Sequence, residues 1–393
     1  MHVSERTLLL GLGNETTNCK NLSVFFAVIC VIDVFGVFPI IALPKAIINC
    51  GYYGILVVIV VCSFQIYTAI LLGRCWVILE EIYPTVNTKN RYPYSALAEI
   101  TYGKRWANFV TLLLDLTVFS GGIPNLILAS QNLQLLGLRI SGGNVNITDC
   151  YWIIIVGLVL CPILWLGSPK DMKCVCTLSV FMVISVFFLS CYCLIFTVDD
   201  DVDLEKITNA NEDPLWKSIL LAYGIMAFQF DIHPTILTIQ VDMKEKLKLP
   251  KAILFGFMVT VSMLAVTTSL AAINYGTATR TSILEMLPTT TVLHVAAALT
   301  TAQLCLTSVV SNNALYQHME DCLCISREFN SKRCVLRSIL NLLAILLAES
   351  VPRFDIVMSF IGGTLTGPLI FTLPPLFYIK VLELQTKREE QLL

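Results

Sequence analysis

Two segments of the chain place a carboxylate beside a helix breaker inside an apolar run. In the first segment Asp33 precedes Gly36 and Pro39, and in the second segment Asp231 precedes Pro234 by three residues. Proline removes a backbone donor and clashes with the preceding turn, so backbone carbonyl groups are freed at both places. Freed carbonyls and a buried carboxylate can bind a proton, a cation or the ammonium group of a small solute.

Catalytic and metal chemistry are less well supported by the same residues. His233 follows Asp231 by two positions, and on one continuous helix the two side chains would point to different faces. No nucleophile or second histidine accompanies them, so an intramembrane enzyme is the least favoured class. The spacing of the 15 cysteines predicts neither a metal site nor a bound cofactor.

The elements that position these residues are membrane helices. Of the 393 residues, 56% are hydrophobic and 14% are charged, and the mean hydropathy is +0.76, which excludes a soluble globular protein. A net charge of −2 gives no basis for a nucleic-acid partner, and the lipid bilayer is the expected environment. Ten apolar segments are candidate spans, of which the fourth and the ninth are short: 22–48, 53–79, 106–136, 152–167, 174–197, 216–240, 251–274, 292–316, 335–349 and 355–379. We therefore expect an all-α, polytopic fold of about ten transmembrane helices.

The distribution of basic residues predicts the topology. With the N-terminus in the cytoplasm, only six of the 26 Lys and Arg residues fall outside the cytoplasmic side. The expected organisation is a cytoplasmic tail at 1–21, a transmembrane domain at 22–379 and a second cytoplasmic tail at 380–393. Asn146 begins a glycosylation sequon in the loop after the third span, on the opposite face.

The membrane itself is less well defined by the sequence. An acidic dileucine pattern at 5–10 favours endosomes or lysosomes, but the plasma membrane and other vesicular membranes remain open.

The two broken spans are the first of each half if spans one to five and six to ten form two repeats. This arrangement predicts an inverted 5+5 repeat whose site lies at the bilayer midplane, between discontinuous helices 1 and 6. The alternative is that the prolines only kink packed helices. We expect the solute at the residues that flank the breaks, namely Gly36, Val37, Phe38, Phe228, Gln229 and Phe230.

Coupling to an ion is expected at the few polar side chains within the spans. A carboxylate in a low-dielectric site can load and release a proton near neutral pH, and Asp33 is the leading candidate. Sodium bound by Asp33 or Asp231 is the rival. Asp115 and the hydroxyl and amide groups of span eight serve either packing or ion binding. The full set of coupling candidates is Asp33, Asp231, His233, Asp115, Ser308 and Asn312.

Five short blocks resemble the amino acid/auxin permease family, which includes vesicular and proton-coupled amino acid transporters. The resemblance covers about 340 residues. Its blocks are Ala42–Ala46 with Gly51–Gly54, Ala129–Leu133, Phe230–Thr235 with Asp242–Lys244, Asn313–Glu320, and Gly362–Leu365 with Pro374–Phe377.

The resemblance implies the inverted-repeat fold of the bacterial leucine transporter type, an amino-acid substrate and coupling to protons or sodium. Family members typically have Asn at the position of Asp33 and glycines at those of Val37 and Ala42. The titratable Asp33 fits proton coupling better. The expected function is secondary active transport of amino acids by alternating access. A transporter-like sensor that binds the amino acid without net flux is the other alternative.

Overall fold

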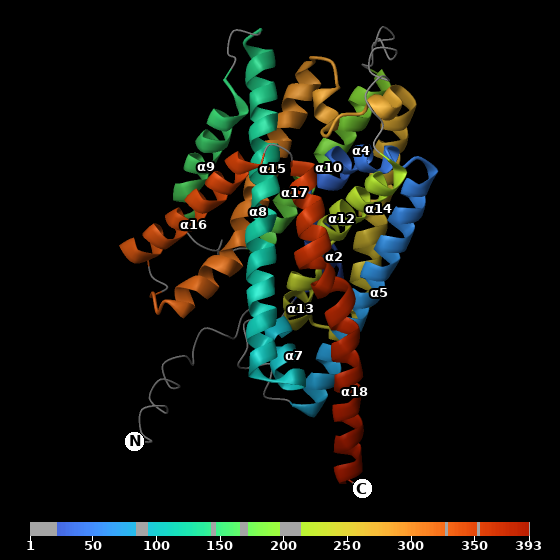
Figure 1. Ribbon diagram of the computed structural model, residues 1–393, viewed down its shortest axis with the longest axis vertical. Coiled ribbons are helices and arrows are strands. Elements are labelled where there is room, and N and C mark those ends of the chain that lie inside the picture. The colour runs from blue at the N-terminus through green and yellow to red at the C-terminus, as the bar shows by residue number, and fades with distance from the viewer. Residues whose placement is uncertain are drawn as a thin grey trace.

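The chain folds into a bundle of long helices with short connections (Figure 1). The computed structural model describes residues 22–83, 93–142, 147–165, 172–196, 214–326, 329–351 and 354–392. The α-helices are α2 (Val24–Phe35), α3 (Phe38–Ile41), α4 (Leu43–Ile48), α5 (Tyr52–Ile82), α7 (Pro93–Tyr102), α8 (Lys104–Ile140), α9 (Asp149–Trp165), α10 (Met172–Phe196), α12 (Leu215–Gln229), α13 (His233–Asp242), α14 (Leu249–Tyr275), α15 (Thr291–Cys322), α16 (Ser331–Ser350), α17 (Phe354–Ile361) and α18 (Leu373–Leu392). Short 3₁₀ turns are η1 (Lys246–Lys248), η2 (Gly276–Ala278) and η3 (Ile283–Glu285), and two π-helical turns are η4 (Gly362–Thr366) and η5 (Pro368–Thr372).

Each of the ten expected spans corresponds to a helical segment. In the part of the chain that the structure describes, seven helices are long and apolar enough to cross a membrane. The other three expected spans correspond to the broken segment α2–α4, the 17-residue α9 and the 20-residue α16. The all-α polytopic fold expected from the sequence is therefore confirmed.

Several helices extend well beyond the bilayer core. The 37 residues of α8 and the 32 residues of α15 correspond to roughly 55 Å and 48 Å, against about 30 Å of hydrocarbon. The segment 380–393, expected as a tail, continues α18 as helix to Leu392, and Figure 1 shows it projecting from the bundle. These helices are thus longer than the spans predicted from hydropathy, because the helix continues into the polar residues that flank each apolar segment.

Two helices are discontinuous, and they are the two expected. The chain leaves helical geometry at Gly36 between α2 and α3, and again at 230–232 between α12 and α13. Around the breaks, α2 packs on α14 and α10, α12 packs on α17 and α5, and α8 packs along α15. The breaks therefore lie inside the bundle.

Candidate functional site

The break in α2 depends on a glycine. Gly36 has φ +60°, a conformation that costs an L-residue with a side chain about 1–2 kcal/mol. A Cβ atom built on Gly36 would also lie 2.9 Å from Nε2 of Gln303 in α15. The turn of the chain and the close approach of α15 both require the missing side chain.

The two breaks are joined directly by a hydrogen bond. Nε2 of Gln229, the last residue of α12, donates to the backbone oxygen of Phe35, the last residue of α2, at 2.5 Å. Nε2 of Gln65 in α5 donates to the backbone oxygen of Ala227, two residues before Gln229 in α12, at 3.0 Å. Carbonyls freed near the ends of both helices are thus satisfied by side-chain amides, as lipid could not satisfy them.

Aromatic rings close the space between the breaks. The ring of Phe35 lies 5.0 Å from that of Phe230 and 4.9 Å from that of Phe257 in α14. Val37 and Phe230 are fully buried and Phe38 is nearly so. The break at Gly36 therefore lies beside Gln229 and Phe230, and Val37 and Phe38 are buried directly after it.

Phe228 lies on the side of the breaks that faces α8. The two ring atoms nearest to a Cβ built on Gly121 are those of Phe228, both at 3.7 Å. Its side chain is half-buried and packs against the hydrophobic core.

Asp33 lies one turn before the break, against α10. Ser179 and Cys176 of α10 hydrogen-bond to its side chain, yet its buried Oδ1 has no partner among the described residues. The Ser179 hydroxyl also accepts a bond of 3.3 Å from Nε2 of Gln303. Oε1 of Gln303 is likewise buried and unpartnered within the described chain. Two buried acceptor oxygens without donors therefore occur beside Ser179.

Gln303 and Ser179 were missed by sequence reasoning. Gln303 is fully buried, and its Nε2 also donates to the hydroxyl of Thr307 at 2.8 Å. An amide side chain within the apolar run of span eight was the available signal, since such groups are costly in lipid unless they are paired. The pairing with α10, by contrast, depends on the packing of helices distant in sequence.

Asp231 and His233 are brought together, which corrects the expectation that they point to different faces. Asp231 Oδ1 lies 3.3 Å from His233 Nδ1 and accepts the backbone N–H of His233 at 3.0 Å. The expectation was wrong because Asp231 precedes α13 instead of standing within it, so helical spacing does not apply. In this structure the carboxylate of Asp231 occupies the N-terminus of α13.

Asp115 pairs with a residue that was not singled out from the sequence. Its Oδ2 lies 2.6 Å from Nδ1 of His318, and the pair joins α8 to α15. Both side chains are about one-fifth exposed. This partner supports a structural role for Asp115 in holding the two helices together.

Ser308 and Asn312 face a different region from Asp33. They line a small cavity of about 20 Å³ with Gly122, Leu160 and Asn341, between α8, α9, α15 and α16. The Ser308 hydroxyl donates to the backbone oxygen of Leu304 at 2.8 Å, whereas Oδ1 of Asn312 is buried and unpartnered among the described residues. The α15 residue that bonds to Ser179 is instead Gln303, which also bonds to Thr307.

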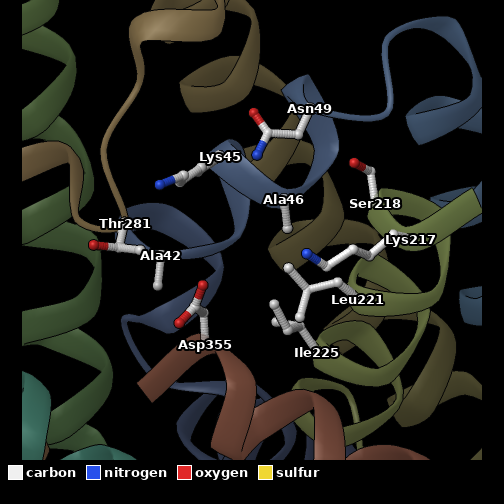
Figure 2. Close-up of a pocket in the computed structure, with 10 residues that line it drawn as sticks. All are labelled: Ala42, Lys45, Ala46, Asn49, Lys217, Ser218, Leu221, Ile225, Thr281 and Asp355. Carbon is white, nitrogen blue, oxygen red and sulfur yellow. The ribbon is translucent and has the colours of Figure 1, made fainter. Parts of the chain in front are cut away.

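A larger pocket of about 120 Å³ leads from one end of the bundle toward the broken helices. Figure 2 shows Lys45 and Lys217 on opposite sides of it and Asp355 of α17 below them. Ala42 and Ile225 are apolar members of its lining. The charged groups of this pocket were not predicted, although charges at the ends of apolar segments were the available signal.

Leu22, which precedes α2, is paired through its backbone with the end of α13. The N–H of Leu22 donates to the oxygen of Asp242 at 3.0 Å, and the oxygen of Leu22 accepts from Lys244 at 3.1 Å. Leu22 and Met243 thereby form a parallel bridge and are buried. The start of α2 in one broken helix and the end of α13 in the other are held together at this point.

Two broken helices joined at a buried centre, with a polar pocket lined by residues beside both of them, are the arrangement of the leucine-transporter fold. The fold resembles solved structures of that kind: MhsT in complex with L-phenylalanine (TM-score 0.56, 13% identity, 90% of this chain and 87% of that chain) and the closed conformation of Mhp1, a nucleobase-cation-symport-1 family transporter with bromovinylhydantoin bound (TM-score 0.54, 14% identity, 90% and 78%). The inverted-repeat fold class expected from the sequence is confirmed.

The chain belongs to the transmembrane amino acid transporter protein family, whose pattern matches residues 20–393. It is similar to Arabidopsis thaliana amino acid transporters AVT1E (25% identity, 94% of this chain and 69% of the relative) and AVT1J (23% identity, 87% and 79%). The resemblance drawn from the sequence is confirmed, and the protein is a transporter and not an enzyme. The sequon at Asn146 and the pattern at 5–10 lie outside the described residues.

Proposed function

We propose that the protein is a secondary active transporter that moves an amino acid across the membrane by alternating access, coupled to a proton that binds at Asp33. The observation that carries the coupling is the pair of buried oxygens, Asp33 Oδ1 and Gln303 Oε1, that have no donor among the described residues. A proton on Asp33 supplies one missing donor. One proton driven by about 100 mV and one pH unit supplies roughly 3.7 kcal/mol, enough for several hundredfold accumulation.

The substrate site in this proposal is the closed centre between the breaks. An α-amino acid has an ammonium group that can take the place of the Gln229 amide on the Phe35 oxygen, which is a backbone acceptor at a helix C-terminus. The pocket beside Lys45, Lys217 and Asp355 is the access route, since its mixed charges suit a zwitterion. The pairing of Leu22 with Met243 closes the opposite route.

Sodium is the second candidate for the coupling ion, because two acceptor oxygens beside a hydroxyl also suit a hard cation. Uptake of a labelled amino-acid mixture into proteoliposomes separates the two. We expect a pH gradient to drive uptake without sodium and Asp33→Asn to remove the dependence on pH. Uptake that requires sodium and ignores the pH gradient would show that the ion is sodium. Binding without any flux would show a sensor.

The matched control for Asp33→Asn is Ser185→Ala in α10. Ser185 is half-buried, and the bond that its hydroxyl makes within the described part of the chain is to the backbone oxygen of Phe181. This variant should keep both the rate and the pH dependence.

We further propose that both termini are cytoplasmic and that the pocket opens to the other side. The excess of Lys and Arg on the loops of one face supports this orientation. Glycan mapping after Asn146→Gln tests it. Asn14 also begins a sequon, and a sugar on Asn14 would reverse the orientation. The membrane is proposed to be the plasma membrane or an endosomal, lysosomal or vesicular membrane, which a tagged full-length chain can resolve by microscopy.

A further inference from the structure

A second buried carboxylate, that of Asp231, lies at the break between α12 and α13 and contacts a histidine. The side chains of His233 and Asp231 are 0% and 5% exposed, and His233 Nδ1 faces Asp231 Oδ1 at 3.3 Å. The helix that carries them, α13, packs against α5 and α7, whereas the side chains that bond to Asp33 belong to α10. The two acids therefore have separate surroundings.

The orientation of the imidazole is fixed from α5. Nε2 of His233 lies 3.0 Å from the hydroxyl of Thr68. That hydroxyl has a single hydrogen, and two backbone oxygens of the same helix lie within its reach, those of Phe64 at 2.9 Å and Gln65 at 3.3 Å. With the hydrogen directed to the Phe64 oxygen, the Thr68 oxygen accepts from the ring, and Nε2 of His233 carries a hydrogen.

A neutral ring with its hydrogen on Nε2 presents a lone pair at Nδ1. Nδ1 is buried and makes no hydrogen bond among the described residues, and the atom facing it is the Asp231 oxygen, itself an acceptor. Two acceptors that face each other away from water are unfavourable. One additional proton between Nδ1 and Oδ1 satisfies both atoms and leaves the buried pair with no net charge.

Other titratable groups nearby do not supply this proton. Tyr94 of α7 lies near Asp231 and Cys75, but its hydroxyl donates to the backbone oxygen of Leu369 in η5 at 2.7 Å. Among the described residues, the charge that acts on Asp231 is that of His233. The neighbouring acid on α2, Asp33, is bonded by α10.

We infer that Asp231 and His233 together bind one proton at a second site, which Thr68 orients, and that the transport cycle exchanges this proton. Only the exchange rests on the proposed function, because the binding follows from the geometry of the pair. Thr68 is a positioning residue in this site. The proton moves between Nδ1 and Oδ1 without any change in the total charge of the pair.

The protonation of His233 can be measured in the purified protein, without transport, by nitrogen NMR of ¹⁵N-histidine. The signals lost in His233→Gln identify this residue among the four histidines. If that variant is not recovered folded, His2→Gln, His294→Gln and His318→Gln identify it by elimination. We expect both ring nitrogens to be protonated or hydrogen-bonded near neutral pH, and Asp231→Asn to change the Nδ1 signal. A ring whose Nδ1 stays unprotonated from about pH 5 to 8 overturns the proposal.

The role of Thr68 is tested by a matched set of substitutions. Thr68→Val should change the Nε2 signal of His233, and Thr68→Ser should restore it. Thr267→Val is the control, because the buried hydroxyl of Thr267 in α14 bonds, within the described part of the chain, to the backbone oxygens of Met263 and Leu264. An unchanged Nε2 signal in Thr68→Val, or an equal change in Thr267→Val, contradicts the orientation by Thr68.

The exchange is tested by adding a mixture of the standard amino acids to weakly buffered protein containing a pH-indicator dye. Asp33→Asn should retain part of the proton signal, and Asp33→Asn combined with Asp231→Asn should lose it. Complete loss in Asp33→Asn alone overturns exchange at the second site. A protein that shows the NMR signature but neither binds nor moves amino acids refutes the proposed function and leaves the proton site standing.

Discussion

The side-chain amide of Gln229 donates a 2.5 Å hydrogen bond to the backbone oxygen of Phe35, so the last residue of α12 caps the last carbonyl of α2. Both residues are buried. This single bond joins the two discontinuous helices at the centre of the bundle. In this structure Gln229 occupies the acceptor at which we propose that the substrate ammonium binds.

Replacing Gln229 by alanine should therefore weaken the empty protein more than the loaded one. The substitution leaves a buried carbonyl unpaired, which costs about 1–3 kcal/mol and lowers the midpoint of thermal unfolding in detergent. An ammonium group can satisfy the same oxygen, so amino-acid binding should raise that midpoint by more in Gln229→Ala than in the unsubstituted protein. An equal rise in both proteins would show that the Phe35 oxygen does not receive the substrate. Gln134→Ala is the control, because Gln134 bonds a loop carbonyl, that of Ile147, far from the breaks.

Gly36→Ala should abolish most transport while leaving a folded protein. The new methyl group meets Gln303 at 2.9 Å in a backbone conformation with φ +60°. Gly51→Ala separates the two effects, because Gly51 has φ +55° but nothing within 4 Å of the added atom. We expect Gly51→Ala to show only the strain of about 1–2 kcal/mol in its unfolding, and Gly36→Ala to lose uptake at least tenfold as well. Equal uptake in the two variants would contradict a role for the contact with Gln303.

The sequence was sufficient to locate the breaks but not their partners. Hydrophobicity and the position of Pro39 and Pro234 predicted ten spans and two discontinuous helices, because both follow from local rules of chain geometry in lipid. Asp33 was identified because a carboxylate beside a helix breaker within an apolar run can be recognised from the local sequence alone. Its neighbours Ser179 and Gln303 lie about 145 and 270 positions away in sequence, and no single-sequence pattern records that they meet it.

A prediction from helical spacing was wrong where the chain is not helical. It separated Asp231 from His233, although the break that the same sequence predicts places Asp231 outside α13. It placed Ser308 and Asn312 on one stripe, and both line the same small cavity, whereas the face of α15 that meets α10 carries Gln303. The period of a helix shows which residues share a face, but the packing of the bundle decides what that face meets.

A disulfide between positions 22 and 243 should stop transport reversibly. Leu22 and Met243 are paired as neighbours in a parallel bridge, and at such pairs the Cα atoms are about 5 Å apart, within the range that a disulfide spans. Alternating access requires α2 and α13 to separate at this point. Copper-catalysed oxidation of Leu22→Cys with Met243→Cys should therefore block uptake, and reduction should restore it. The two single substitutions are the controls for the native cysteines, and full uptake after verified cross-linking would show that this end does not open.

Glu320→Gln should destabilise the protein more than any comparable change on its surface. Glu320 Oε1 accepts from Nε of Arg337 at 2.6 Å and from Nε of Arg333 at 3.1 Å, and its side chain is 2% exposed. Arg337 also donates to the backbone oxygen of Leu164 at 2.6 Å, so the cluster joins α9, α15 and α16.

Removing this carboxylate charge leaves two guanidinium groups without their shared partner, and breaking a buried ion pair costs about 3–5 kcal/mol. Glu383→Gln, which removes the exposed partner of Lys380, should leave the midpoint of unfolding almost unchanged. Unfolding in increasing SDS measures both variants. Equal midpoints would mean that the charge of Glu320 is dispensable, and the joining of the three helices would then have to come from their apolar contacts.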